Sequence, residues 1–177
     1  MPAPATATNL SVIFDCLEFA LKQITHANGF RTHGALVDRS KDPRVIRQNK
    51  PEEYEKFQCA LSLTRTRRKL DRAKSIMRHV WDCHVNVMGI RTLTTAEDDA
   101  GRHLDELAAD LQDDVRVCLL KDAGLRQAAS ALGIDPPNIT GLSVDEIIED
   151  QGANFPSAHF VIVIYFRMEE RTGFPGQ

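Results

Sequence analysis

Hydrophobic residues recur with two periods along the chain, and the longer period predicts helices. The first apolar stripe predicts a helix over residues 11–27, which Asn28-Gly29 ends. A second stripe predicts a long helix over 95–121, and a brief helix over 125–132 follows it. The two main stripes consist of Leu10, Ile13, Phe14, Leu17, Leu21 and Ile24, and of Leu104, Leu107, Leu111, Val115 and Cys118.

The shorter period, strict alternation of apolar and polar residues, predicts strands over 57–64 and 80–88. Each of these strands would bury one face. Residues 160–166 are β-branched or aromatic throughout, which indicates a strand in the interior of the sheet, covered at least in part on both sides.

Two stretches have a weaker pattern. Residues 31–51 are expected to form a surface loop with one short strand at 35–37, because Pro43 and Pro51 interrupt the pattern. Residues 141–148 fit either a strand or a turn.

These elements predict an α+β fold of two layers, with a small mixed or antiparallel sheet of three to five strands and two main helices packed on one face. We expect one domain over residues 10–168, with a basic β-connection at 65–80. Flexible segments over 1–9 and 169–177 would flank it.

The composition is that of a soluble globular protein, with 42% hydrophobic and 27% charged residues among 177. No apolar run is long enough to span a bilayer, and the start of the chain lacks the features of a secretory signal. The four cysteines are widely spaced, and each falls on the apolar face of its element. We expect Cys16, Cys59, Cys83 and Cys118 to be reduced core thiols in a reducing cytoplasm.

Charge is distributed unevenly along this chain of formal net charge −3. Six cations and one acid lie within residues 65–74, here called the basic segment: Arg65, Arg67, Arg68, Lys69, Arg72 and Lys74. The fifteen residues between the two predicted strands are far more than a tight hairpin needs. They fit a long loop, an outward continuation of the strands, or a short helical turn at the tip. An acidic cluster follows later in the chain: Asp145, Glu146, Glu149 and Asp150.

The basic segment has three interpretations. It fits a solvated loop, a nucleic-acid contact or a protein-docking element. Nucleic acid is disfavoured because no aromatic residue is interleaved with the cations and the pI is about 6.1. In the docking interpretation, the basic segment of one copy meets the acidic cluster of the next, and such a head-to-tail contact closes into a ring when the rotation permits.

No reaction centre is evident. His84 and Asp82 share the polar face of one predicted strand, with His79 and His103 not far away, but they follow no metal-ligand spacing. The chain has no nucleophile elbow, phosphate loop or H-E-x-x-H motif. We therefore expect no catalytic, cofactor or metal site, and not an enzyme.

The order of the elements and the residue types within them are similar to those of a known family. They comprise an opening helix ending in His26-Ala27-Asn28-Gly29-Phe30, two strands, and a helix containing Leu104-Asp105-Glu106-Leu107 and Asp113-Asp114-Val115-Arg116. An acidic stretch and a hydrophobic strand over 158–166 close the pattern. Over about residues 10–168, the chain resembles the tail terminator proteins of long-tailed bacteriophages, of the minor tail protein U type.

The resemblance implies a hexameric ring that caps the tail tube, stops its growth and joins it to the head connector. Its partners would be further copies, the tube protein and connector proteins, with DNA passing only through the lumen and no membrane contact. The protein would be made in the host bacterial cytoplasm and reside at the head-proximal end of the virion tail. Alternatives are a connector adapter of the phage neck and an accessory nucleic-acid-binding protein that uses the basic segment.

Overall fold

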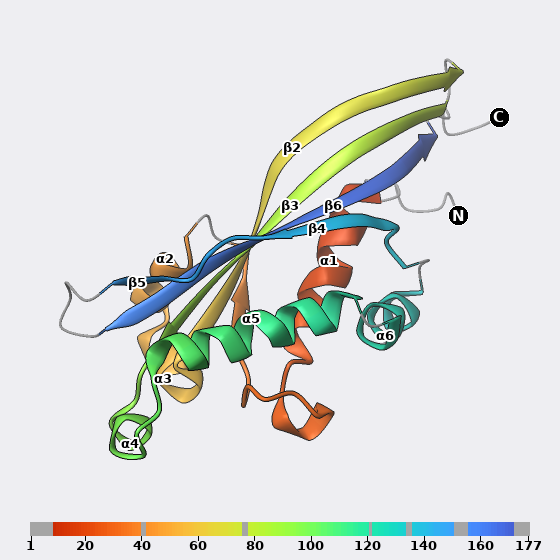
Figure 1. The fold of residues 1–177 in the computed structure, drawn as a ribbon. Coiled ribbons are helices and arrows are strands. Elements are labelled where there is room, and N and C mark those ends of the chain that lie inside the picture. Colours follow the sequence, from red (N-terminus) through yellow and green to blue (C-terminus); the bar gives the residue numbers. More distant parts are fainter. Residues whose placement is uncertain are drawn as a thin grey trace.

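The computed structural model describes residues 9–39, 42–75, 78–120, 122–133, 136–150 and 156–171 (Figure 1). The described helices are α1 (Asn9–Lys22), α2 (Pro43–Asn49), α3 (Pro51–Phe57), α4 (Thr95–Asp99), α5 (Leu104–Leu120) and α6 (Asp122–Leu132), with a 3-10 turn at His26–Asn28. The described strands are β1 (Leu36–Asp38), β2 (Cys59–Ser75), β3 (Arg78–Thr92), β4 (Ile139–Val144), β5 (Ile148–Asp150) and β6 (Ser157–Arg171).

The strands form one open, mixed sheet of six strands in the order β1-β2-β3-β6-β4, with β5 also paired to β6. Only β1 and β2 run parallel among these pairs; the others are antiparallel. The predicted α+β class is thus confirmed, with one strand more than the expected range. The interior position predicted for the last strand is also confirmed, because β6 lies between β3 and β4.

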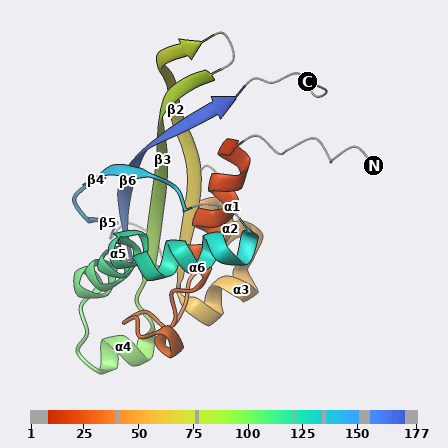
Figure 2. The ribbon, with the colours of Figure 1, turned by 90° about the vertical axis from the view of Figure 1, so that its right-hand side faces the viewer.

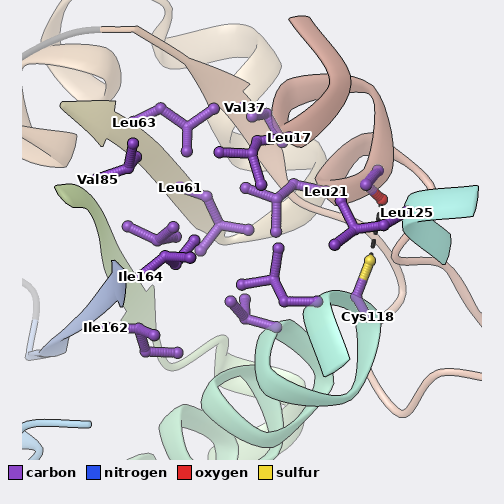
Figure 3. Packing of buried hydrophobic residues seen from close by; sticks show 14 of the residues in the cluster. Leu17, Leu21, Val37, Leu61, Leu63, Val85, Cys118, Leu125, Ile162 and Ile164 are labelled. Carbon is purple, nitrogen blue, oxygen red and sulfur yellow. Dashed lines mark hydrogen bonds between the residues drawn. The ribbon is translucent and has the colours of Figure 1, made fainter. Parts of the chain in front are cut away.

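Helices α1, α5 and α6 cover one face of the sheet, and the main core lies between these two layers (Figure 3). Leu17 and Leu21 of α1 face Leu61 of β2 and Ile164 of β6 there, all with no solvent exposure. The alternating residues that the sequence assigned to a buried face therefore do form it. All four cysteines are buried and free, as predicted.

The opposite face of the sheet, here called the outer face, is covered only in part. Helices α2 and α3 pack on it through Ile46 and Tyr54, which cluster with Ala60 and Ile90. Farther along β3 and β6, the outer-face side chains are half-buried: His84, Met88, Val161, Val163 and Tyr165. Among the described residues, no helix therefore covers much of this face.

The short strand expected within residues 31–51 is present as β1, but α2 replaces part of the expected loop, and α3 begins where that loop was expected to end. Asp42 caps α2 by accepting a hydrogen bond from the Arg44 N–H, and Pro43 occupies the first helical turn. Pro51 likewise occupies the first turn of α3, which has no side-chain cap. The prolines that suggested a loop instead begin helices, because a proline at this position loses no helical hydrogen bond.

The predicted helix over 95–121 is two helices. Thr94 and Glu97 form the capping box, not Thr95 and Asp98, and α4 ends at Asp99. Gly101, at a φ of +70°, turns the chain before α5 begins. Likewise, α1 ends at Lys22, earlier than expected, and the predicted left-handed glycine is Gly29 after the 3-10 turn.

The basic connection continues the strands outward. β2 extends to Ser75 and β3 begins at Arg78, so the alternatives of a long loop and a helical turn are wrong over the described residues. With the end of β6, these strands form a ribbon that extends beyond the helices (Figures 1 and 2). The paired residues 65–75, 78–85 and 164–171 are here called the projecting ribbon. The domain boundary expected at 168 falls inside β6, and the ends 1–8 and 172–177 lie outside the described residues.

Candidate subunit-contact surfaces

All six cations of the basic segment lie in β2, on the projecting ribbon. Arg65, Arg67, Arg68, Lys69 and Arg72 each have a register partner on β3. Three register shifts interrupt this pairing, and Thr66, Asp71 and Lys74 are the extra residues at these bulges. Bulges increase local twist and break the regularity of an edge strand. The predicted basic element therefore lies on strand backbone that pairs with β3 but bulges at three positions.

The base of the ribbon contains Asp82 and His84, the candidate residues for a reaction centre. Asp82 forms an ion pair with Arg167 of β6 at 3.1 Å. The His84 ring packs edge-on against Tyr165, with ring centroids 4.6 Å apart. Both side chains thus make cross-strand contacts on the outer face. Within the described residues, no group of three or more His, Cys, Asp or Glu side chains is placed to hold a metal ion.

The acidic cluster occupies the turn after β4 and strand β5. The Asp145 N–H donates to the Val161 carbonyl at 2.9 Å, and the Asp145 carbonyl accepts from the Gln112 side chain at 3.0 Å. β5 pairs with the start of β6, with Glu149 opposite Ala158. These backbone contacts fix where Asp145, Glu146, Glu149 and Asp150 are presented.

A small cavity of about 100 Å³ opens on the outer face beside the acidic cluster. It is here called the outer-face pocket. Apolar side chains from three strands contribute to its walls, among them Met88, Ile148 and Val161. Asp42, Arg44, Asp145 and Glu146 also line it, so its lining includes three acidic residues and one arginine.

Arg44 is held by the cap of α2. Its guanidinium lies 3.0 Å from the Asp42 carboxylate. Partial burial raises the pKa of Asp42, but hydrogen bonds and charge from Arg44 outweigh it and leave the pKa below its ordinary value. Asp42 therefore stays ionised at neutral pH, and the lining of the pocket has a negative balance.

The basic segment and the acidic cluster lie at opposite ends of the sheet (Figure 1). Twelve residues of β6 separate His159, which pairs with Ile148, from Arg171, which pairs with Arg78. At ~3.3 Å per residue this is about 40 Å. The outer end of the basic segment is therefore held away from the acidic cluster within one chain, whereas Arg65, at its inner end, lies level with Ile164, five positions from His159.

Sequence reasoning found the acidic cluster but missed the outer-face pocket next to it. Ile147 packs against the main core, whereas Ile148 is 59% exposed. The available signal was these two adjacent isoleucines inside an acidic run, because strand alternation sends neighbouring side chains to opposite faces. The contributions of Met88 and Val161 depend on strand pairing that local sequence does not reveal.

No protein-family model matches the chain, and a search of the curated proteins finds no match. In the part of the chain that the structure describes, no helix combines the length and the apolar character needed to cross a membrane.

Proposed function

We propose that the chain is a structural subunit of a bacteriophage tail, a tail terminator that assembles head to tail into a ring. The observation that carries the proposal is that the outer end of the basic segment and the acidic cluster lie at opposite ends of one continuous sheet. Complementary patches that cannot meet in one chain can meet between copies, and a heterologous contact of this kind closes when its rotation fits a ring.

The proposed ring has six copies, as the family resemblance implies. Its two faces would bind the tail tube protein and the head connector, at the head-proximal end of the virion tail, with DNA passing through the lumen. Charge matching between projecting ribbon and acidic cluster would set orientation and partner choice. The proposal assigns the chain no catalysis, cofactor or metal. The alternative, a connector adapter of the phage neck, would also assemble head to tail into a ring.

Charge reversal tests the contact directly. One variant replaces all six cations of the basic segment with Glu, and the other replaces Asp145, Glu146, Glu149 and Asp150 with Lys. Each variant alone presents like charges at both surfaces and is expected to stay monomeric by mass photometry. Their equimolar mixture restores every contact in alternation and is expected to form even-numbered rings.

The matched control carries Glu53→Lys and Glu55→Lys on α3, where both residues are exposed. It is expected to assemble like the unchanged protein. A protein that stays strictly monomeric, both alone and mixed with tube protein, would contradict the ring.

The placement of six cations on a projecting ribbon also favours a second candidate, a nucleic-acid contact. This candidate predicts binding to duplex DNA that weakens steeply as salt rises, because phosphate contacts release counterions. The absence of DNA binding at low salt would contradict this candidate function.

A further inference from the structure

The outer-face pocket has the size of one side chain. Its volume is about 100 Å³. An apolar cavity of ~150 Å³ accepts a benzene ring, whereas pockets for drug-sized ligands have ~300–1,000 Å³. The pocket therefore fits a single aliphatic or thioether side chain from a macromolecular partner, not a cofactor or metabolite.

The rim of the pocket specifies the charge of that partner. Asp145 and Glu146 are exposed, and Asp42 adds a third carboxylate against the guanidinium of Arg44. Ile148 leaves 59% of its surface in solvent at the same site. A complementary segment needs an apolar side chain to enter the pocket and flanking cations to meet the carboxylates.

One segment of this chain has that composition. Ile76 and Met77 connect β2 to β3, and Lys74 and Arg78 flank them. The end of the hairpin, where Ser75 pairs with Arg78, lies about 40 Å along the sheet from the pocket of its own chain, at ~3.3 Å per residue. The segment can therefore reach such a pocket only on a different copy.

We propose that the outer-face pocket of one copy receives Ile76 or Met77 from the β2–β3 hairpin of the next copy. This inference rests on the proposed ring and deepens it, because it names the side chains that fix the position of the ribbon on the next copy. Charge attraction brings the ribbon to the acidic cluster, and insertion of one apolar side chain into a shaped cavity fixes its position. The contact then resembles other interfaces, with an apolar anchor inside a charged rim.

Disulfide cross-linking tests the pairing. The protein with Ile148→Cys and Met77→Cys, after mild oxidation, is expected to give a ladder of covalent oligomers on a non-reducing gel. The background is low because Cys16, Cys59, Cys83 and Cys118 are each at most 1% exposed. The matched control combines Met77→Cys with Leu132→Cys on α6, which is 41% exposed, and is expected to stay monomeric on the gel.

A second variant measures the contribution of the anchor. Ile76→Ser together with Met77→Ser leaves every charge in place and is expected to weaken assembly by about tenfold or more, since apolar burial is lost. The charge-reversal mixture keeps both anchors and serves as the reference for ring formation.

The outcomes separate the two proposals. If the charge-reversal mixture forms rings but the Ile148/Met77 pair gives no ladder, the anchor is wrong and the ring stands. A cross-link from Ile148→Cys to a connector or tube protein in place of a second copy would equally overturn the anchor. If no rings form under any condition, both proposals fail.

Discussion

The buried guanidinium of Arg91 joins the end of β3 to the start of α4. Its Nη1 donates to the carbonyls of Gln58 and Thr92, at 3.1 and 2.7 Å, and its Nη2 forms an ion pair with Glu97. Glu97 also accepts the Thr94 N–H at 3.0 Å as part of the capping box. Arg91 is only 8% exposed, so loss of the Glu97 charge leaves a buried cation with weaker compensation.

Glu97→Gln is expected to lower the free energy of unfolding by about 2 kcal/mol at neutral pH. Partial burial raises the pKa of Glu97, but hydrogen bonds from Thr94 and the charge of Arg91 outweigh it and hold the pKa below its ordinary 4.5. A lowered carboxyl pKa stabilises the fold above that ordinary value, and the stabilisation is lost as pH falls through the lowered value.

Urea unfolding at several pH values measures this difference. The gap between the unchanged protein and Glu97→Gln should be constant above pH 4.5 and should narrow below it. Glu106→Gln is the control, because its carboxylate is 57% exposed and pairs with Arg102 only at 4.0 Å. A pH-independent gap would show that the ion pair is not the cause.

The buried cysteines should be chemically inert while the protein is folded. Burial raises the pKa of Cys16 to about 11 and those of Cys59 and Cys118 to about 12. Cys83 is 1% exposed. Because the thiolate is the reactive form, a disulfide reagent at about pH 8 should label no thiol in the native state and four in denaturant. Fast labelling of the native protein would contradict the buried placement.

At the scale of elements, close packing between β3 and β6 depends on one glycine. A Cβ at Gly89 would lie 2.3 Å from the ring of Phe160, which pairs with it across the strands and is 2% exposed. Gly89→Ala is expected to cost about 1–3 kcal/mol through overpacking, because the buried ring has little room to move.

Thermal unfolding of Gly89→Ala and Gly141→Ala makes a matched comparison. A Cβ at Gly141 would meet Tyr165 at 3.7 Å, which is ordinary van der Waals contact. Gly141→Ala should therefore unfold close to the unchanged protein, whereas Gly89→Ala should unfold at lower temperature. Equal melting temperatures would mean that the sheet adjusts around Phe160.

Elements with a sustained apolar pattern could be predicted from the sequence, whereas short elements defined by local capping could not. The stripe of Leu17 and Leu21 and the run at 160–166 each bury a full face, so their type follows from pattern alone. α2 and α3 have seven residues each and bury few side chains, so their pattern is weak. Asp42 before Pro43 was the available signal, since it combines an N-cap with a proline in the first turn.

At the scale of the molecule, the charges of the candidate surfaces were evident in the sequence but their geometry was not. The outer end of the basic segment and the acidic cluster are separated by most of the length of β6, and this depends on pairing between strands far apart in the chain. The outer-face pocket has the same origin, because its walls come from α2, β3, β5 and β6. Local periodicity carries no information on such non-local register.

The salt dependence of assembly should distinguish the charged part of the proposed contact from its apolar part. Attraction between the basic segment and the acidic cluster is screened as the Debye length falls from ~10 Å at about 0.1 M salt to ~3 Å at about 1 M. Insertion of Ile76 or Met77 into the pocket buries apolar surface and is not weakened by this screening. Assembly of the unchanged protein should therefore weaken across this range but persist in part, as measured by sedimentation velocity.

The variant with Ile76→Ser and Met77→Ser should lose assembly completely at about 1 M salt, because only the screened charges remain. Identical salt dependence of the two proteins would argue against the apolar anchor, and assembly of the unchanged protein that does not respond to salt would argue against the charged contact.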